Sequence, residues 1–410
     1  MRAVAEERLE AASQAFRVHV DRCLGCRACE TVCPSGVRYG SLLEVARTQA
    51  VGTGERPVLA RLVLRLFASR GATRISMLLS QLLRATGLPA LAARVLPALG
   101  PLAEVRIAMG MLAATAPWRP TGLSAARAGG RRPRRPRAEG HGGGASVGAA
   151  AGPVGLLEGC VQEGLFAHVN RATERVLSVN GLETIRVPGQ GCCGALHAHG
   201  GDLEGARALA RRNVGAFEAA GVEVVVANAA GCGAAMKEYG ELLAHDPSWA
   251  ERARAFAARV RDVSEVLAER GPLPGGPLRL VATYDAPCHL LHAQRVDVAP
   301  KAVLAAIPGI ELRPLQGEEE CCGGAGIYGL THARLGGWIG DDKAGAVEAT
   351  GAEVVATGNP GCMMQIGARL RMRGSEVRTA HPVELLDESY RVAGLYPAEG
   401  RPLPGLGGAR

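Results

Sequence analysis

The stretch Gly189-Gln-Gly-Cys-Cys-Gly194 and its counterpart Glu320-Cys-Cys-Gly-Gly324 decide the fold of this 410-residue chain, because they mark an internal repeat. Outward from each pair of adjacent cysteines, one further cysteine lies upstream and one lies downstream. The two copies are offset by 128 to 130 residues at every anchor point. The anchors are Cys160 with Cys288, Cys192 with Cys321, Cys193 with Cys322, and Cys232 with Cys362. An offset this constant indicates a duplicated module.

Each cysteine group follows a short apolar stretch that is typical of a buried strand. In the first copy, helical stretches are expected at about 165–180 and 202–220, between the strands. Strands that alternate with helices favour parallel βαβ units, so the sequence predicts an α/β fold with two tandem modules. The expected strands are 154–157, 184–187 and 222–227 in the first copy, and 278–283, 310–314 and 353–356 in the second.

The four cysteines of each module are expected to meet at one edge of a sheet, since open α/β sheets bind ligands beyond the carboxyl ends of their strands. Adjacent cysteines do not comfortably form a disulfide with each other, and two neighbouring thiolates followed by glycine suit a polynuclear metal centre. Gly194 and Gly323 permit the sharp turn, and N–H groups near Gly324 are available to the sulfurs as hydrogen-bond donors. A zinc site, or a set of redox thiols without metal, stays open as an alternative.

A second cysteine pattern lies near the start of the chain. Cys23-x2-Cys26-x2-Cys29-x3-Cys33-Pro34 has the spacing of bacterial ferredoxins. Three of its thiolates are expected to hold one [4Fe–4S] cluster, while Cys33 points toward another cluster. Zinc usually takes two separated C-x2-C pairs, so this spacing favours iron and sulfide.

The chain divides into six expected segments. Its formal net charge of +8 is local, because five arginines fall within 131–137, a proline-broken run that reads as part of a disordered linker. The segments are a ferredoxin-type half domain (1–50), a helical connector (51–117), an Arg/Gly/Pro linker (118–152), module 1 (153–270), module 2 (271–392) and a tail (393–410).

Composition and patterning exclude several classes of protein. Basic residues do not gather on a folded face, so no nucleic-acid partner is expected. Neither a signal peptide nor a membrane-spanning stretch is visible, and the twelve cysteines are therefore expected to be reduced and clustered for metal or redox chemistry. Arginines interrupt the apolar region 56–117, which is interpreted as a connector that packs on its own protein or as an amphipathic surface for a membrane or a partner.

Histidines lie close to the cysteines, but hydrolytic triads, P-loops and dinucleotide fingerprints are not recognised. Each histidine is interpreted as a neighbour of the centres or a surface residue rather than as a ligand. They are His197, His199, His289, His292 and His381.

Taken together, the motifs resemble a known family. The cysteine modules are similar to the CCG domains of heterodisulfide reductases, of the anaerobic glycerol-3-phosphate dehydrogenase small subunit, and of lactate and glycolate oxidation complexes. The ferredoxin run, the helical connector and two modules most resemble the glycolate oxidase iron–sulfur subunit family, over nearly the whole chain apart from the linker. The supporting segments are Cys33-Pro-Ser-Gly-Val-Arg-Tyr-Gly40, Tyr284-Asp-Ala-Pro-Cys-His-Leu290, Glu320-Cys-Cys-Gly-Gly324, Gly358-Asn-Pro-Gly-Cys362 and His381-Pro-Val-Glu-Leu-Leu386.

The resemblance implies a role in electron transfer. A separate flavoprotein subunit would oxidise glycolate or a similar 2-hydroxy acid, and this subunit would pass the electrons toward quinone or another acceptor. It implies [4Fe–4S] ligation by Cys23, Cys26, Cys29 and Cys33, with further iron–sulfur centres held by the eight module cysteines. Because no signal peptide is visible, we expect a cytoplasmic protein, and the amphipathic interpretation of 56–117 would place it peripherally at the inner face of the membrane.

Two departures from the family pattern accompany the resemblance. Cys232 and Cys362 stand alone where some modules end in C-x-x-C, which puts a five-thiolate cluster in doubt. Only one ferredoxin run is present where the family normally has two, and residues 1–16 are interpreted as the helix that would join them. We therefore expect that the true start lies upstream or that the gene was truncated. Related complexes that serve glycerol 3-phosphate, lactate or a disulfide, and a zinc-stabilised binding scaffold, stay open as alternatives.

Overall fold

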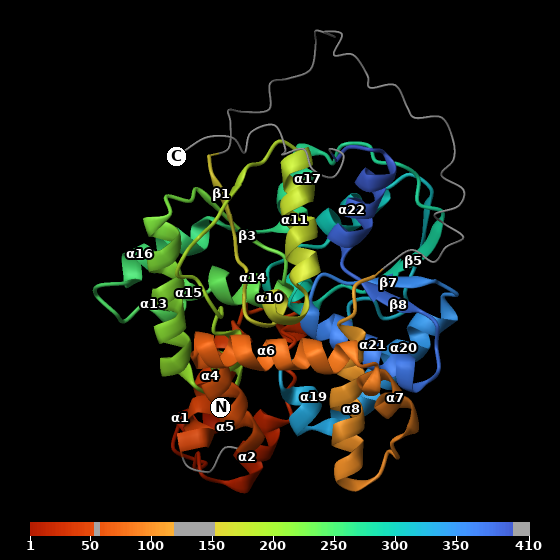
Figure 1. Ribbon diagram of the computed structural model, residues 1–410. Helices are drawn as coiled ribbons and strands as arrows, with labels where there is room; N and C mark the ends of the chain where they lie inside the picture. The colour runs from red at the N-terminus through yellow and green to blue at the C-terminus, as the bar shows by residue number, and fades with distance from the viewer. Residues whose placement is uncertain (53–57, 119–151, 397–410) are drawn as a thin grey trace.

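Two four-stranded parallel sheets form the centre of the molecule (Figure 1). The structure is a computed structural model that describes residues 1–52, 58–118 and 152–396. Module 1 has the strand order β2-β1-β3-β4, and module 2 has the equivalent order β6-β5-β7-β8. The strands are β1 (Val154–Leu156), β2 (Thr184–Ile185), β3 (Val224–Ala227), β4 (Val260–Asp262), β5 (Leu280–Tyr284), β6 (Ile310–Arg313), β7 (Val354–Ala356) and β8 (Arg378–Ala380).

The register of the strands makes the repeat quantitative. Val154 of β1 pairs with Thr184 and with Val224, and Ala282 of β5 pairs with Leu312 and Val354. Equivalent positions are therefore 128 residues apart in the first two strands of each module and 130 apart in the third. This confirms the predicted duplicated α/β fold and fixes which side chains correspond.

Each module has one strand more than the sequence predicts. β4 and β8 are only three residues long and contain charged residues such as Arg261 and Arg378, so neither has an apolar run that would predict a strand. Each is an edge strand next to the third strand of its sheet. A short edge strand needs little apolar surface, which is why the apolar pattern missed both.

Helices cover both sheets. Module 1 contains α10 (Val161–Leu165), α11 (Ala167–Val179), α12 (Ala195–His199), α13 (Leu203–Ala219), α14 (Ala230–Lys237), α15 (Tyr239–Leu242), α16 (Ala250–Ala258) and α17 (Val263–Arg270). Module 2 contains the π-helix η1 (His289–Ala293), α18 (Val298–Ala305), α19 (Tyr328–Thr331), α20 (Ala333–Ala349), α21 (Pro360–Met372) and α22 (Pro382–Val392).

The two modules share one hydrophobic core. Val176 and Leu177 of α11 belong to the same buried cluster as Leu386 and Tyr390 of α22, near the upper centre of Figure 1. Beside it, the Arg175 guanidinium forms two bonds to Asp387, of 2.9 and 2.7 Å. The modules are therefore packed against each other as one body.

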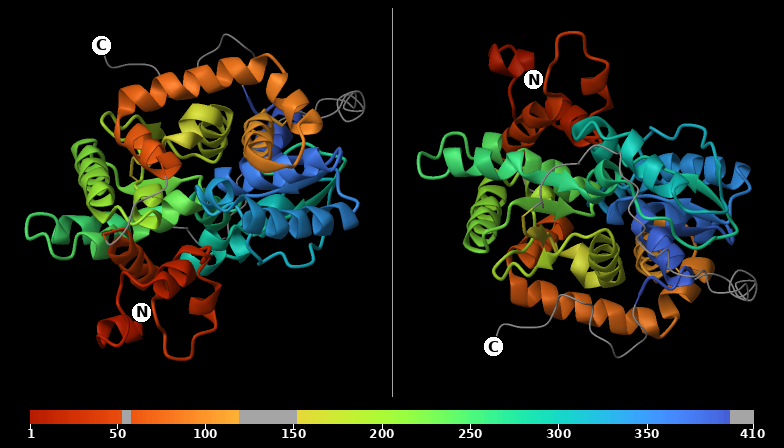
Figure 2. Two further views of the ribbon diagram at one scale, coloured as in Figure 1. Left: turned by 90° about the horizontal axis from the view of Figure 1, so that it is seen from below. Right: turned by 90° about the horizontal axis from the view of Figure 1, so that it is seen from above.

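The described N-terminal residues form helices and connecting loops, but residues 1–16 are not organised as predicted. Residues 1–16 do not form one helix, because the chain turns after α1, Glu7 has a φ of 56°, and Ser13 caps α2. Figure 2 shows this segment and helix α6 on opposite sides of the paired modules. The helices are α1 (Arg2–Ala5), α2 (Gln14–Asp21), α3 (Ala28–Thr31), α4 (Tyr39–Gly52), α5 (Val58–Ala68), α6 (Arg70–Ala85), α7 (Leu88–Val95) and α8 (Gly100–Ala114).

Two sequence predictions are left open by the structure. The linker at 118–152 lies almost wholly outside the described residues, and the exact segment boundaries stay predictions. Within the described ranges, no single helix is both long and apolar enough to cross a membrane. Helices α6 and α7 together would be, but they are bent by 72°.

Candidate metal centres

The four cysteines of module 1 follow β1, β2 and β3 and meet beyond the carboxyl ends of these strands, with Cys160 at the N-terminus of α10 and Cys232 in the first turn of α14. The Sγ atoms of Cys160 and Cys192 are 3.4 Å apart, and those of Cys193 and Cys232 are 3.1 Å apart. The Cys192 sulfur is also hydrogen-bonded to the thiol of its neighbour Cys193. The structure thus brings the four together as the sequence predicts.

Module 2 repeats this arrangement. The Cys288 thiol is hydrogen-bonded to Cys321, and the Cys322 thiol is hydrogen-bonded to both Cys321 and Cys362. All of these except Cys321 are buried. Two sets of four thiols are therefore enclosed at equivalent edges of the two sheets.

Charge is unevenly distributed within each set. In module 1, hydrogen bonds from Cys160 and Cys193 hold the pKa of the Cys192 thiol well below its usual range. Those same bonds, together with burial, raise the pKa values of Cys160 and Cys193. Four buried thiols this close cannot all ionise unless a cation compensates them, so the donor set fits a cationic metal centre.

The geometry differs from that of a preformed single-ion site. In the described parts of the chain, no three His, Cys, Asp or Glu side chains surround one point at which a single metal ion could bind. The thiols approach as pairs instead.

Glycines permit the turn after each pair of adjacent cysteines. Gly194 and Gly323 have φ angles of 86° and 80°, a region that favours glycine. Their N–H groups donate to the sulfurs of Cys192 and Cys321, at 3.5 and 3.4 Å. A Cβ at Gly324 would lie 3.2 Å from the Gly361 carbonyl oxygen.

The ferredoxin run packs against module 2. Cys26 lies close enough to Cys288 and Cys321 for their charges to act on one another. Thr31, at the end of α3, is 3.3 Å from the His292 ring nitrogen Nδ1. The first cysteine pattern and the second module thus share one region of the protein.

Within this run, Cys29 is exposed and lies near both Cys23 and Cys33. The Cys23 sulfur accepts from the Gly25 N–H at 3.4 Å, and Cys29 is influenced by the charges of Cys23 and Cys33. The backbone N–H groups of residues 35–37 lower the pKa of the partly exposed Cys33 thiol. That Cys33 points toward another cluster stays a prediction.

The histidines lie around the thiols. His197 is buried and hydrogen-bonds to Cys192, and His289 Nδ1 is 3.5 Å from the Cys288 sulfur. Burial and the neighbouring His199 lower the pKa of His289 to about 3, so its ring is neutral. His381 lies further away, where it caps α22 and donates to the Asn228 carbonyl at 2.9 Å.

The neighbourhood of the thiols differs between the modules at one equivalent helix position. Gly194 packs against Ala206 of α13, and Gly323, its counterpart in module 2, packs against Gly336 of α20. Ala206 and Gly336 are therefore equivalent, and so are other positions of these two helices that are 130 residues apart. Asn213 therefore corresponds to Lys343. No sequence pattern points to this pair, because a single lysine inside a helix is ordinarily a solvated one.

In module 2, Lys343 forms a buried ion pair. Its Nζ is 2.9 Å from Asp285 Oδ1, with side-chain exposures of 2% and 1%, and Thr357 donates to the other carboxylate oxygen. Desolvation raises the pKa of Asp285. It also opposes the Lys343 charge, but pairing raises the lysine pKa overall. Lys343 also lies near Cys322 and Cys362.

In module 1, uncharged groups take the same place. Asn213 donates to the Cys192 carbonyl at 3.0 Å, and the Tyr239 hydroxyl donates to the Cys193 carbonyl at 2.7 Å. Leu157 stands where module 2 has Asp285, since both follow equivalent strands. Module 1 thus holds the carbonyls of its two adjacent cysteines by neutral hydrogen bonds, and Arg70 donates to the Gln190 carbonyl earlier in the same loop.

A single amide connects the two thiol sets. Asn359 Oδ1 accepts from the Gly231 N–H at 3.2 Å, and its Nδ2 donates to the Cys362 sulfur at 3.3 Å. Because a backbone N–H can only donate, this contact fixes the orientation of the amide. Gly231 directly precedes Cys232, so the bridge extends from one cysteine loop to the other.

Comparison with known proteins agrees with these sites. The cysteine-rich (CCG) domain matches residues 154–237 and 282–367, and the 4Fe-4S binding domain matches residues 16–39. The probable glycolate oxidase iron–sulfur subunit of Bacillus subtilis (strain 168) is 35% identical over 402 residues, covering 95% of this chain and 86% of the relative.

Two further relatives extend the comparison. The glycolate oxidase iron–sulfur subunit of Escherichia coli (strain K12) is 32% identical, over 90% of this chain and 82% of its own length. Lactate utilization protein A of Exiguobacterium sp. is 29% identical over 58% of this chain and 99% of the relative. With its 4Fe-4S segment, its two cysteine-rich modules and this coverage, the chain belongs to the family of glycolate oxidase iron–sulfur subunits.

Proposed function

We propose that the chain is the electron-transfer subunit of a flavin-dependent glycolate, or similar 2-hydroxy acid, dehydrogenase complex. A separate flavoprotein subunit would oxidise the substrate, and this subunit would pass the electrons toward quinone or another acceptor. The observation that carries the proposal is continuity between the three cysteine sets. Cys26 adjoins Cys288 and Cys321, and Asn359 joins module 2 to module 1.

In this proposal all twelve cysteines are ligands. When bound, iron–sulfur clusters supply one-electron transfer at the potentials that their surroundings set. The chain's own residues hold the thiolates, exclude water from the two module sets, and donate N–H groups of Gly194 and Gly323 to sulfur. The ligands would be Cys23, Cys26, Cys29 and Cys33 in the first set, Cys160, Cys192, Cys193 and Cys232 in the second, and Cys288, Cys321, Cys322 and Cys362 in the third.

Iron and acid-labile sulfide in anaerobically purified protein test the cofactor part. We expect both, with the content falling on Cys193→Ala and on Cys322→Ala. Zinc in place of iron and sulfide would instead indicate the scaffold alternative. A cysteine change that leaves iron and sulfide unaltered would remove that residue from the ligand set.

Co-purification from the native cell tests the substrate and the partner. We expect a flavoprotein to accompany the chain, and the complex to reduce an added quinone with glycolate. Since relatives include lactate utilization proteins, lactate is the comparison substrate. Faster quinone reduction with lactate, glycerol 3-phosphate or a thiol–disulfide couple would show that the chain belongs to one of the alternative complexes.

We also propose that the complex associates peripherally with a membrane whose lipids are anionic, from its cytoplasmic side, through the surface formed by α5 to α8. Among the described residues, 13 of the 22 exposed large hydrophobic side chains lie in 58–105, including Ile75 and Leu79 at 63% and 60% exposure. Residues 58–105 contain six arginines and a single carboxylate, Glu104. An apolar face flanked mainly by positive charge is complementary to acidic headgroups.

Vesicle sedimentation tests the membrane proposal. The purified complex should sediment with vesicles that contain phosphatidylglycerol and less with phosphatidylcholine vesicles. Leu79→Glu, on the exposed face of α6, should reduce sedimentation, whereas Leu273→Glu, on a different exposed loop, should not. Equal sedimentation of the two variants would contradict the assigned surface.

A further inference from the structure

A cavity of about 630 Å³ lies between helix α6 and the loops that carry the module 1 cysteines. Cys160 and Cys192 line it, whereas Cys193 and Cys232 do not, so it lies on the outer side of this thiol set. Its volume is in the range of small-molecule binding sites. A ligand in this cavity would therefore lie directly against two of the four thiols.

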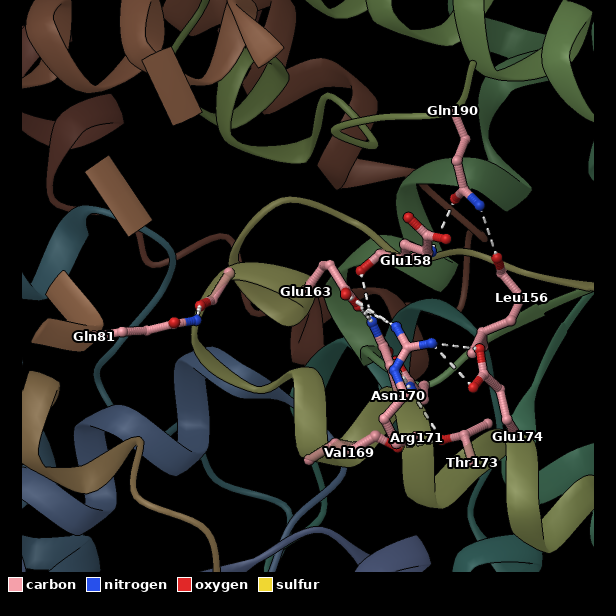
Figure 3. A network of polar contacts seen from close by, with 12 residues as sticks. Gln81, Leu156, Glu158, Glu163, Val169, Asn170, Arg171, Thr173, Glu174 and Gln190 are labelled. Carbon is pink, nitrogen blue, oxygen red and sulfur yellow. Dashed lines mark hydrogen bonds and ion pairs between the residues drawn. The ribbon is translucent and has the colours of Figure 1, made fainter. Parts of the chain in front are cut away.

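The side of the cavity formed by α6 is held in place. The Gln81 side chain donates to the Gly164 carbonyl (Figure 3). Met77 packs over Gly164 so closely that a Cβ there would lie 2.3 Å from the Met77 Cγ atom. The absence of a side chain at residue 164 thus lets α6 approach the cysteine loop.

The opposite side is held by a hydrogen-bond network, which Figure 3 shows. Gln190 donates to the Leu156 carbonyl at 3.0 Å, and its Oε1 accepts from the Glu158 N–H at 2.8 Å. Asn170 donates to the Glu158 carbonyl at 3.0 Å. Because these bonds connect β1, α11 and the loop before Cys192, the cavity is preformed.

Positive charge exceeds negative charge around this cavity, because four arginines line it against the two carboxylates of Glu158 and Glu163, and Glu158 acts on Arg70 without forming an ion pair with it. Glu163, one of its two carboxylates, is paired with Arg171, 2.8 Å away. In the part of the chain that the structure describes, no carboxylate lies within ion-pair distance of any arginine in the cavity lining. Partial burial and the charges of Arg212 and Arg74 lower the pKa of Arg70, which shows how closely like charges are placed. The lining arginines are Arg70, Arg74, Arg186 and Arg212.

The rest of the lining indicates the shape of the ligand. Phe67, Met77 and Leu78 form an apolar wall on the α5–α6 side, while the arginines face it from both α6 and module 1. An ordinary solvated arginine cluster would have no apolar wall and no thiols beneath it. The complementary molecule has an apolar body and one anionic group.

Module 2 does not repeat this chemistry. By strand register Arg186 corresponds to Pro314, and by helix register Arg212 corresponds to Asp342. The thiols of module 2 instead adjoin Cys26 of the ferredoxin run. The basic cavity is thus a property of module 1 and not of the duplicated fold.

We propose that this cavity is a binding site for a small organic anion with an apolar body, whose carboxylate or sulfonate group pairs with the arginines while its body lies against Phe67 and Met77. The bound molecule contacts the thiol side of module 1. This site does not depend on the substrate of the proposed dehydrogenase complex.

Two matched probes test the site on the full chain, purified anaerobically with its bound metal. Naphthalene-2-sulfonate and the neutral naphthalene-2-sulfonamide have the same ring and nearly the same size. Equilibrium dialysis should show the sulfonate binding about tenfold more tightly, since a charge-assisted bond supplies about that factor. The double variant R74Q/R212Q should remove this preference.

Control variants separate the cavity from general surface charge. Arg61→Gln and Arg94→Gln remove exposed arginines of α5 and α7 that do not line the cavity, and both should bind the sulfonate as the unaltered chain does. Equal affinity for the two probes would overturn the proposal, as would an equal loss of binding in the controls and in R74Q/R212Q. The four substituted arginines are all exposed, so these changes should leave the iron content of the protein unchanged.

Discussion

Module 1 and module 2 have the same strand order, the same thiol pairing and the same glycine turn, but they support their thiols by different chemistry. Module 1 uses neutral hydrogen bonds from Asn213 and Tyr239, while module 2 buries the Lys343–Asp285 ion pair. The outer side of module 1 borders the basic cavity, whereas module 2 faces the ferredoxin run. Duplication therefore preserved the positions of the thiols while their surroundings diverged, so the two centres need not share one reduction potential.

The largest expected effect comes from breaking the buried ion pair. Lys343→Asn copies the residue of module 1 but leaves Asp285 buried and unpaired. We expect the free energy of unfolding to fall by about 3–5 kcal/mol, measured by anaerobic urea unfolding. The reduction potential of the module 2 centre should also fall, because a positive charge near Cys322 and Cys362 is lost.

The double variant D285L/K343N sharpens this comparison. It installs the complete module 1 pair, Leu and Asn, and should regain most of the lost stability, because an apolar and neutral replacement leaves no unpaired charge. A double variant as unstable as Lys343→Asn would show that the ion pair is not what distinguishes the modules.

The second effect concerns the last helix of each module. Both α17 and α22 begin with a capping box, but Glu265 pairs with Lys237 at 2.8 Å, whereas burial raises the pKa of Glu384 to about 7. His168, 3.3 Å from Glu384, is neutral because burial lowers its pKa to about 4. The folded protein therefore retains the Glu384 proton at a pH where the unfolded chain has lost it.

Stability should consequently fall as pH rises from about 4.5 to about 7, and Glu384 accounts for about 3 kcal/mol of this decrease. Glu384→Gln should remove that part of the slope in urea unfolding curves measured across this range. Glu265→Gln is the control and should change the slope little, since its ion pair is partly exposed. An unchanged slope in Glu384→Gln would contradict the assignment.

A third effect compares the glycine turns. Gly323→Ala should cost about 2 kcal/mol and Gly194→Ala about 1 kcal/mol, because both need a positive φ angle but the first is the more tightly packed. A Cβ would lie 2.6 Å from the Gly336 oxygen in module 2 and 3.2 Å from the Ala206 oxygen in module 1. Thermal unfolding of the two variants gives the order, and the reverse order would refute the difference in packing.

The smallest effect belongs to module 1 alone. Tyr239→Phe removes the bond to the buried Cys193 carbonyl and should cost about 1 kcal/mol. Iron content should be retained, since the hydroxyl touches the backbone of the loop and not a sulfur. Loss of iron in this variant would indicate that the neutral bonds position the thiols as strictly as the ligands themselves do.

The sequence predicted those features that recur at a fixed spacing. The offset between the cysteine sets was sufficient to predict two modules and the meeting of four thiols, because parallel strands end at one edge. The short strands β4 and β8 were missed, since three residues with a charged side chain carry no apolar pattern.

Features that depend on distant segments could not be read from the chain. Arg74 and Arg212 lie 138 positions apart, and in the sequence Arg74 only interrupts an apolar region. Lys343 is likewise one lysine in a helix of small residues, and only the contact between α20 and the residue that follows β5 shows that it is buried beside Asp285. Burial and charge pairing are properties of the folded chain, so local patterns do not report them.

The Asn359 bridge has a consequence for how the two centres sense each other. Hydrogen bonds in a chain polarise one another, so their strengths are cooperative. Additional negative charge on the Cys362 sulfur strengthens the bond from Asn359 Nδ2, which makes Oδ1 a better acceptor for the Gly231 N–H beside Cys232. A change of charge in one module is thereby transmitted as a change of dipole in the other, without any movement of the backbone.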